Sequence, residues 1–495
     1  MTWPKAYGGQ ARSMLERYVV LEEMMAVGAP IGAHSTGDRQ TGPLLLRLGT
    51  EAQKQAFLPR LARGEISICV GLSEPDAGSD LAALRSKAVP QGDGTYRIFG
   101  QKIFITYGEH DMTDNIVHLV LARLADAPAG TKGISLFLVP KFLPDGTRND
   151  VHCTGIEHKL GIHASPTCSM SYGDYGGAIG WLIGEENRGL NCMFTMMNSA
   201  RLSVGLQGVA QGELATQAAL AYARDRKQGR APGSPGTSAI IDHPDIRRTI
   251  ATMRALTDAS RAICYMTAGA LDRARRNGDT AAGDRAALLT PVAKAFSTDI
   301  GNEVASMGVQ VHGGMGFVEE TGAAQIMRDV RIAGIYEGTN GIQSIDLVQR
   351  KLPLGGGAVV RAEIEAMRAT IEAVRATNEP AFGRMATTLG AAVDSLAGAT
   401  EYMLAALGSA PQDALAGATP YLRLFGVARG GTALADLALA SHRLASSGGS
   451  DPAHAARIAT ARFFADHVAT TAGGLEASII EGAQSVHAPS LIAAE

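Results

Sequence analysis

The stretch RIAGIYEGTNGIQ, residues 331–343, places Glu337 in a glycine-rich segment that follows one long helical pattern and begins another. Gly338 and Gly341 have no side chains and tolerate unusual backbone dihedral angles, so a ligand can come close to the backbone beside the carboxylate. Glu337 is therefore our candidate for a catalytic base. Taken alone, the segment supports equally well a glutamate that only caps the following helix.

Helical periodicity dominates the chain on both sides of this stretch. Apolar residues recur three and four positions apart over 189–227, 243–276 and 284–314, which predicts long amphipathic helices packed as a bundle. We interpret the glycine-rich segment 353–358 as a hinge. The helical patterns beyond it predict a folded helical appendage.

The middle of the chain has a different pattern. Residues 66–184 contain short β-branched runs separated by glycine, proline and Asp-Gly turns, which predicts a compact β-domain. The predicted strand runs are 66–73, 95–106, 115–124, 133–140 and 178–185. The expected fold class is therefore mainly α with a central β-domain. Its expected parts are a helical N-terminal part at 1–65, the middle β-domain at 66–184, a helical bundle with Glu337 at 185–352 and a C-terminal helical extension at 353–495.

The composition argues against several classes of protein. A chain of 495 residues with 46% hydrophobic and 19% charged residues suits several buried cores. No apolar run reaches the roughly 18 to 20 residues of a membrane span, and no signal peptide is evident, so we expect a cytoplasmic protein with no membrane partner. Five cysteines without a C-x-x-C motif indicate neither disulfides nor a metal site. The net charge of −3 without a dense basic tract argues against nucleic acid as a partner.

Three motifs together point to a known family. GLSEPDAGSD at 71–80, KIFIT at 102–106 and QVHGGMGFVEETGAAQIMRD at 310–329 stand in the order and approximate spacing of the acyl-CoA dehydrogenase family, which the chain closely resembles up to about residue 352. Within the family, the middle region and the long appendage look most like the branch that contains 3-(methylthio)propanoyl-CoA dehydrogenases. That branch usually has a longer N-terminal helical domain, so the opening helices are expected to be shortened here.

The resemblance implies an architecture and a reaction. The middle domain would be β-barrel-like, between an N-terminal helical part and a helical bundle. Members of this family bind FAD, oxidise an acyl-CoA thioester between its α and β carbons to the trans-2-enoyl-CoA, and pass the electrons to an electron-transfer flavoprotein. The expected partners are thus acyl-CoA, that flavoprotein and further copies of the chain, as a homodimer or homotetramer.

Individual roles follow from the matching positions. Glu337 would take the α proton, while its backbone N–H would help to bind the thioester carbonyl. Phe104 stands where the family commonly has tryptophan, Asn198 stands where it has an acid, and Arg226 matches an arginine that reaches a neighbouring subunit's flavin. The resemblance assigns FAD contacts to Leu72, Ser73, Ser79, Phe104, Thr106, Arg226, Gln310, Gly313, Gly314, Thr339 and Gly341, and substrate contacts to Ser79, Asn198, Arg201 and Gly338.

The chemistry adds one expectation, and other functions stay open. A carboxylate is a weak base for an α proton in water, so we expect water to be excluded around Glu337. The same base would serve an acyl-CoA oxidase, in which oxygen reaches the reduced flavin. A flavin-bearing relative of the DNA-binding alkylation-response proteins and a folded but inactive scaffold are further alternatives.

Overall fold

The computed structural model describes residues 1–488, without the side chains of residues 34, 35, 39 and 194–196. The chain forms two compact units. Unit 1 comprises Met1–Arg17 and Gly28–Ala200, and unit 2 comprises Tyr18–Val27 and the chain from Arg201 onward. The expected fold class is confirmed, because most elements are helices and the strands are confined to the middle of the chain.

The N-terminal part is helical, as predicted for residues 1–65. Helix α4 (Glu51–Arg63) begins with a capping box, in which the Thr50 hydroxyl accepts from the Gln53 N–H and the Gln53 side chain accepts from the Thr50 N–H. It ends at Gly64, which has the left-handed conformation common after helices. The elements of this part are η1 (Lys5–Tyr7), α1 (Met14–Ala26), α2 (Gly32–Thr36), η2 (Gly37–Thr41), α3 (Gly42–Leu48) and α4 (Glu51–Arg63).

The middle of the chain is a mixed sheet with the strand order β1-β4-β5-β8-β3-β7-β6, and β2 pairs with β3. The pair β1–β4 is parallel and the other pairs are antiparallel. Five of the strands fall on runs that we predicted, while β2, β6 and β7 were not recognised. The bounds are β1 (Ile66–Gly71), β2 (Lys87–Pro90), β3 (Tyr96–Thr106), β4 (Asn115–Ala122), β5 (Ser135–Pro140), β6 (Val151–Ile156), β7 (Thr167–Tyr172) and β8 (Ala178–Ile183).

Strand β4 lies at the centre of the core of unit 1. Val117, Leu119 and Leu121 point to one face of the sheet, where they pack with residues of α3 and α4. Ile116 and Val120 belong to the core on the opposite face. A strand buried on both faces accounts for a sequence that is apolar from Ile116 to Ala122 except for the buried His118.

Long helices make up unit 2, as predicted. The helices α5 (Gly189–Asp225), α6 (Pro244–Asn277) and α7 (Thr280–His312) are followed by the shorter α8 (Gly314–Phe317), α9 (Ala323–Val330) and α10 (Asn340–Asp346). Backbones of α5 and α7 touch: a Cβ atom at Gly205 would lie 2.4 Å from the Ala293 carbonyl oxygen, and one at Gly208 would lie 2.3 Å from that of Ser297. Glycine at these two positions fixes how α7 lies against α5.

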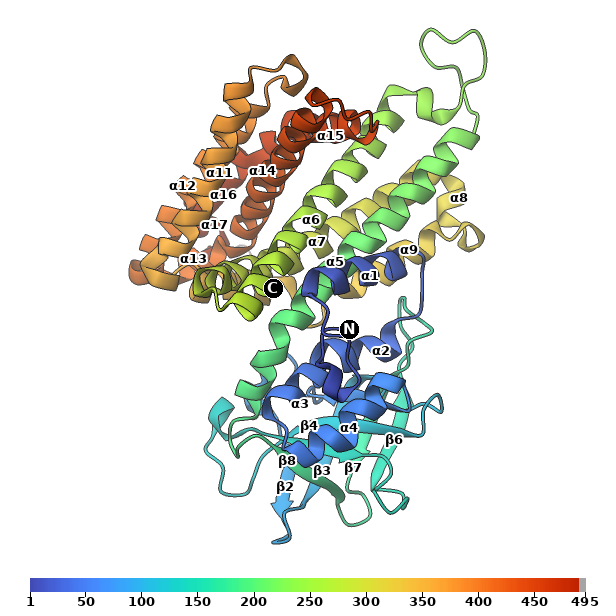
Figure 1. Cartoon of the computed structure of the whole chain (residues 1–495), viewed down its shortest axis with the longest axis vertical. Coiled ribbons are helices and arrows are strands. Elements are labelled where there is room, and N and C mark those ends of the chain that lie inside the picture. Colours follow the sequence, from blue (N-terminus) through green and yellow to red (C-terminus); the bar gives the residue numbers. More distant parts are fainter. Residues whose placement is uncertain (489–495) are drawn as a thin grey trace. The chain divides into compact units, whose positions relative to one another are not determined.

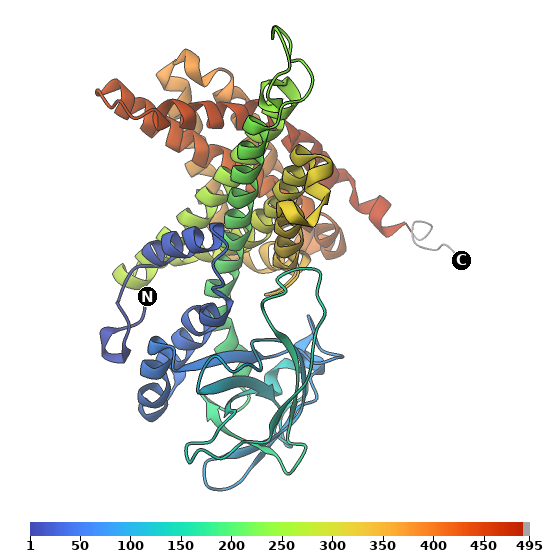
Figure 2. The same cartoon turned by 90° about the vertical axis from the view of Figure 1, so that its right-hand side faces the viewer.

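The C-terminal region is a folded set of helices packed on the bundle. Figure 1 shows α11, α12, α14 and α16 side by side in orange and red, and α14 also contacts α6 and α7. Figure 2 gives the same bundle from the side. The connection at 353–358 is a short turn, η9 (Leu354–Gly357), with three glycines at positive φ. The helices are α11 (Ala358–Thr377), α12 (Met385–Ser409), α13 (Pro411–Ala416), α14 (Ala418–Ser446), α15 (Ala453–His467), α16 (Ala472–Glu481) and α17 (Ala483–His487).

A buried ion network joins this region to the bundle. The Arg285 guanidinium on α7 donates to both oxygens of Glu363 on α11, at 2.6 and 2.9 Å. Arg429 on α14 lies 3.3 Å from the same carboxylate, and both Glu363 and Arg429 are buried. The extension is therefore bound to the bundle by an ion network around the buried Glu363 carboxylate.

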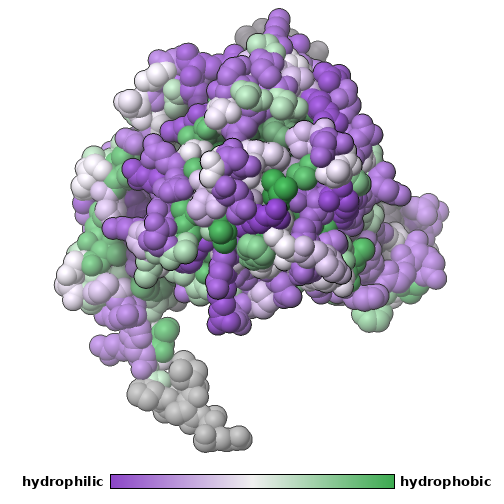
Figure 3. Space-filling model, turned by 90° about the horizontal axis from the view of Figure 1, so that it is seen from below, coloured by the Kyte–Doolittle hydropathy of each residue, from purple (hydrophilic) through white to green (hydrophobic). Residues whose placement is uncertain are grey.

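The surface is mixed in polarity. On the face drawn in Figure 3, apolar residues stand in small groups among polar ones. Among the described helices, none has an apolar stretch that could cross a membrane.

Candidate active site

Glu337 lies in a strained turn of unit 2. Its φ is +55° and that of Gly338 is +83°, both in the left-handed region that residues with a side chain rarely adopt. The Gln343 amide holds this turn by donating to the carbonyl oxygens of Glu337 and Gly338, at 3.4 and 3.2 Å. A Cβ atom at position 338 would lie 2.7 Å from that amide nitrogen, so only glycine fits there. The Thr339 hydroxyl then caps α10 by accepting from the Ile342 N–H.

Arg201 lies beside this turn. One Nη atom of Arg201 donates to Asp346 at 2.7 Å, and the other lies 3.8 Å from the position of a Cβ at Gly338. Both partners of the ion pair are buried, and the Nε of Arg201 has no hydrogen-bond partner among the described residues. The structure thus brings Arg201, Glu337, Gly338, Thr339 and the exposed Gly341 into one region of unit 2.

Lys294 and Asn340 belong to the same region, and sequence reasoning missed both. The Lys294 ammonium on α7 donates to the Asn340 side chain at 2.8 Å. Burial lowers the pKa of Lys294 to about 8, against the opposing effect of the charges of Asp299 and Glu337. The signal in the sequence was a single lysine within the apolar run PVAKAF.

In unit 1, the motifs at 71–80 and 102–106 meet. The Ile103 N–H donates to the Ser73 carbonyl at 3.0 Å, and the buried Lys102 ammonium donates to the Leu72 carbonyl at 3.3 Å and to Glu74 at 2.7 Å. Leu72 and Ser73 are half-buried. Two segments some thirty residues apart therefore form one rigid edge beside Phe104.

A β-bulge presents Phe104 to the solvent. The register of β3 against β7 shifts between Lys102 and Ile105, Phe104 has φ of +60°, and its side chain is 61% exposed. A bulge redirects side chains and is common beside binding sites. An exposed aromatic face next to the Leu72 and Ser73 backbone, with the half-buried Thr106 two residues on, suits a flat aromatic ligand.

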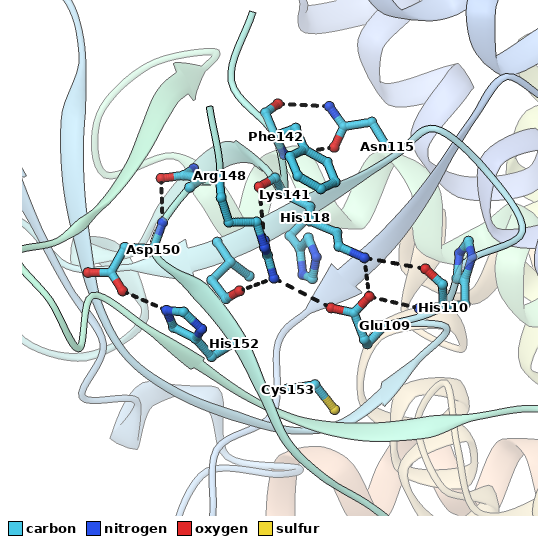
Figure 4. Close-up of polar contacts among 12 residues, drawn as sticks. Glu109, His110, Asn115, His118, Lys141, Phe142, Arg148, Asp150, His152 and Cys153 are labelled. Carbon is cyan, nitrogen blue, oxygen red and sulfur yellow. Dashed lines mark hydrogen bonds and ion pairs between the residues drawn. The ribbon is translucent and has the colours of Figure 1, made fainter. Parts of the chain in front are cut away.

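Ion pairs hold the turn that follows β3. The carboxylate of Glu109 accepts from Lys141 and lies 3.6 Å from the Arg148 guanidinium, which also donates to the Lys141 carbonyl at 2.9 Å (Figure 4). His110 contacts the Ser67 hydroxyl at 2.8 Å through Nε2. These contacts join the turn to β1 and to the segment that follows β5, and so fix the end of the strand that carries Thr106.

The other predicted positions lie elsewhere. Ser79 is exposed and Asn198 is half-buried on α5. Arg226, just after α5, donates to Gln228 at 3.1 Å and is exposed. Gln310 at the end of α7 and the glycines Gly313 and Gly314 after it are exposed as well.

Arg226 and Gln310 share one end of unit 2, because the Tyr222 ring of α5 lies 4.5 Å from the His312 ring of α7. Gln310 stands sixteen residues beyond Lys294 on α7, roughly 24 Å at 1.5 Å per residue. Within one copy of unit 2, these residues are therefore remote from the turn of Glu337.

Models of known protein families match four segments of the chain. Residues 1–65, 69–175 and 187–352 match the family models described as the N-terminal, middle and C-terminal domains of acyl-CoA dehydrogenase, and residues 363–489 match the model "Acetyl-CoA dehydrogenase C-terminal like".

A 3-methylmercaptopropionyl-CoA dehydrogenase of Ruegeria pomeroyi is 46% identical over 453 residues, which are 90% of this chain and 76% of the relative. A butyryl-CoA dehydrogenase of Syntrophomonas wolfei is 39% identical over 64% of this chain, and the chain spans little more than half of that protein, 55%. A solved acyl-CoA dehydrogenase from Bacillus anthracis, complexed with FAD, has the same fold with a TM-score of 0.78 at 22% identity, over 96% of this chain and 79% of that one.

The chain belongs to the acyl-CoA dehydrogenase family. The exposed Phe104 ring beside the backbone of Leu72 and Ser73 fits a flat ring system such as that of FAD.

Proposed function

We propose that this protein is an acyl-CoA dehydrogenase in which Glu337 removes the α proton of an acyl-CoA thioester and the trans-2-enoyl-CoA is the product. FAD supplies the acceptor for the β hydride. The observation that carries the proposal is the turn of Glu337, a glutamate kept at φ +55° with Arg201 close by. Strained dihedral angles of this kind cluster at functional sites.

Each residue of the region has a distinct role in the proposal. The Glu337 carboxylate accepts the proton, and the N–H of the same residue stabilises the negative charge that develops on the thioester oxygen. Gly338 leaves room for the thioester close to the backbone. Asn198 and Arg201, one turn apart on α5, are proposed as substrate contacts.

The FAD contacts of the proposal come in two sets. Leu72, Ser73, Phe104 and Thr106 would contact the isoalloxazine ring, and Ser79 would lie near the pyrophosphate. Thr339 and Gly341 would contact the flavin after the base, while Arg226, Gln310, Gly313 and Gly314 would serve the flavin of another copy of the chain.

We propose a short acyl chain for the substrate and an electron-transfer flavoprotein as the acceptor. The names of the two relatives, 3-methylmercaptopropionyl-CoA and butyryl-CoA dehydrogenase, support a short substrate. The proposed assembly is a homodimer or homotetramer, and the proposed location is the cytoplasm.

Anaerobic titration of the purified holoprotein with 3-(methylthio)propanoyl-CoA, butyryl-CoA and octanoyl-CoA tests the proposal. We expect the flavin absorbance to bleach, most readily with the two short thioesters, and enoyl-CoA to form in equal amount. A flavin that stays oxidised with all three would contradict it. Rapid reoxidation of the reduced protein by oxygen would favour an oxidase instead of a dehydrogenase.

A further inference from the structure

Lys102 is a buried cation that contacts the edge formed by Leu72 and Ser73 in unit 1. Its side chain is 0% exposed, and its ammonium donates to the Glu74 carboxylate at 2.7 Å and to the Leu72 carbonyl at 3.3 Å. The ion pair with Glu74 compensates the charge of the lysine. It does not account for the second hydrogen bond, which goes to a peptide group beside the exposed Phe104 ring.

The backbone at this contact is held in one orientation. The Leu72 carbonyl accepts from the Lys102 ammonium, and the Ser73 carbonyl accepts from the Ile103 N–H at 3.0 Å. The following residue, Glu74, exchanges backbone hydrogen bonds with Ala77, each at 3.0 Å. The peptide group that joins Leu72 to Ser73 is therefore fixed on both sides.

The Ser73 N–H is the other end of that peptide group. The peptide bond is trans, so its N–H points opposite to its carbonyl and away from the Lys102 ammonium. Ser73 is half-buried, and its N–H donates to no carbonyl oxygen among the residues that the structure describes. Because half-buried backbone donors normally have a partner, this N–H is suited to an acceptor atom of a ligand.

The carboxylate of Glu74 is bound to a different segment of the chain. It accepts from the Arg85 N–H at 2.5 Å, from the Ser86 N–H at 3.1 Å and from the Ser86 hydroxyl at 2.6 Å. These donors disperse the negative charge of the pair, while the positive charge acts directly on the Leu72 carbonyl. The pair therefore polarises the Leu72–Ser73 peptide group from its positive end.

We propose that Lys102 is a positioning residue that raises the reduction potential of the bound flavin: through the Leu72–Ser73 peptide group, its charge strengthens the Ser73 N–H as a donor to the pyrimidine edge of the isoalloxazine ring. This inference rests on the proposed function, in which Leu72 and Ser73 contact that ring. Hydrogen bonds in series polarise one another at low dielectric. The acceptors of that edge, N1 and the carbonyl oxygens, carry more negative charge in the reduced flavin, so a stronger donor favours reduction.

Two variants remove the charge, and a third is the control. Lys102→Met removes the ammonium and leaves Glu74 without its counter-charge. The double variant Lys102→Met, Glu74→Gln removes both charges, which protects the test if the single variant fails to fold, because a buried ion pair can be replaced by neutral side chains at little cost. Lys87→Met is the matched control, since Lys87 is an exposed lysine of the neighbouring strand β2.

The measurement is the midpoint potential of the FAD-loaded protein without substrate, near pH 6.5. Lys102 is protonated at this pH, because burial lowers its pKa only to about 8. We expect the ratio of the dissociation constants of oxidised and reduced FAD to fall at least tenfold in both Lys102 variants. For a two-electron couple this lowers the potential by about 30 mV. Lys87→Met should have the potential of the parent.

Equal potentials in the parent and in both Lys102 variants overturn the inference even if FAD binds more weakly, because a purely structural lysine would affect oxidised and reduced FAD alike. Loss of FAD in both redox states from both variants overturns it for the same reason. The acyl-CoA thioesters test the proposed function separately. Lowered potentials in the Lys102 variants, with a parent flavin that no thioester reduces, contradict the proposed function and leave the inference standing.

Discussion

Glu337 is unusual because a glutamate occupies a backbone conformation that favours glycine. The left-handed region costs a residue with a Cβ roughly 1–2 kcal/mol. Glycine at position 337 would avoid this cost, so the side chain must contribute something that stability does not explain. A strained residue beside a buried ion pair is the pattern of a functional site.

The first prediction concerns Glu337→Gln. The amide is nearly isosteric and the backbone N–H is unchanged, so we expect the variant to fold, to retain FAD and to bind thioester, which should perturb the flavin spectrum. Flavin reduction should be slower by about 10²-fold to 10⁴-fold, the typical contribution of a general base. Stopped-flow absorbance measures this rate. Glu320→Gln, at an exposed glutamate of the preceding segment, serves as the control, and parent-like bleaching of Glu337→Gln would exclude Glu337 as the base.

At the scale of elements, strand β3 has two features that shape the candidate site, a β-bulge and a buried ion pair. Its bulge turns Phe104 outward, and its Lys102 ties the strand to the loop after β1 through Glu74. The bulge exposes the Phe104 ring, and the ion pair fixes the backbone beside that ring. Each can be tested without the other.

The second prediction is that Phe104→Ala weakens FAD binding without weakening the fold. Since the ring is exposed, truncation should change the free energy of unfolding of the apoprotein by no more than about 0.5 kcal/mol. The dissociation constant of FAD, followed by flavin fluorescence, should rise. Val89→Ala, at an exposed apolar residue of β2, should leave FAD binding unchanged. Equal affinity in Phe104→Ala and the parent would remove Phe104 from the cofactor site.

The third prediction concerns pH and the buried pair Glu74–Lys102. Burial alone would raise the pKa of Glu74, but the Lys102 charge and the hydrogen bonds from Lys102, Ser86 and the Arg85 N–H hold it below its usual value. A lowered carboxylate pKa stabilises the folded state above the unfolded-state pKa, and this contribution is lost as the pH falls through the folded-state value.

Glu74→Gln should therefore destabilise the protein by about 3–5 kcal/mol at pH 7, because it leaves Lys102 buried without its counter-charge. The difference from the parent should begin to shrink as the pH falls below the ordinary glutamate pKa of 4.5, and should go on shrinking until the pH has passed the lower folded-state pKa of Glu74. Urea unfolding at several pH values measures both effects. A difference that does not depend on pH would show that the Glu74 charge is not what stabilises this loop.

The sequence predicted the regular elements better than the contacts between them. The long helices have an unmistakable period, and α5, α6 and α7 lie where it placed them. Strand β7 was missed because TCSMSY has no β-branched apolar residue, and β6 was missed because four residues separate the Val and the Ile of VHCTGI. The two strands pair with each other, and β7 also pairs with β3. Sequence reasoning missed Lys294 for a related reason. Its partner Asn340 is forty-six residues away, and only the packing of α7 on α10 brings the two side chains together.

At the scale of the whole molecule, the C-terminal extension is part of unit 2 and not a separate module. The fourth prediction is that Glu363→Gln destabilises bundle and extension together by about 3–5 kcal/mol, because Arg285 and Arg429 lose their shared buried counter-charge. Glu401→Gln is the matched control in the same extension, since Glu401 forms a similar two-point pair with Arg361 on the surface, where ion pairs contribute little.

Thermal unfolding followed by circular dichroism should show a single transition at lower temperature for Glu363→Gln and almost no change for Glu401→Gln. A separate early transition in Glu363→Gln, with the rest of the protein unaffected, would mean that the extension folds independently of the bundle.

The fifth prediction tests the assembly. If Arg226 serves the flavin of another copy, Arg226→Ala should lower FAD occupancy and shift the protein toward smaller species in light scattering combined with gel filtration. Arg224→Ala, two residues earlier in the last turn of α5, is the control. Full FAD occupancy in a variant that remains monomeric at all concentrations would contradict the proposed role.

The segment of α7 around Lys294 is enclosed from two directions by residues without side chains. Gly205 and Gly208 of α5 touch its backbone on one side, and a Cβ at Gly426 of α14 would lie 2.1 Å from the Phe296 ring on the other. Substitutions in α14, far along the sequence from Glu337, can therefore shift the part of α7 that contacts the Glu337 turn through Asn340. Random mutagenesis confined to α14 should yield variants with altered turnover as well as altered stability, and libraries that spare the appendage would miss them.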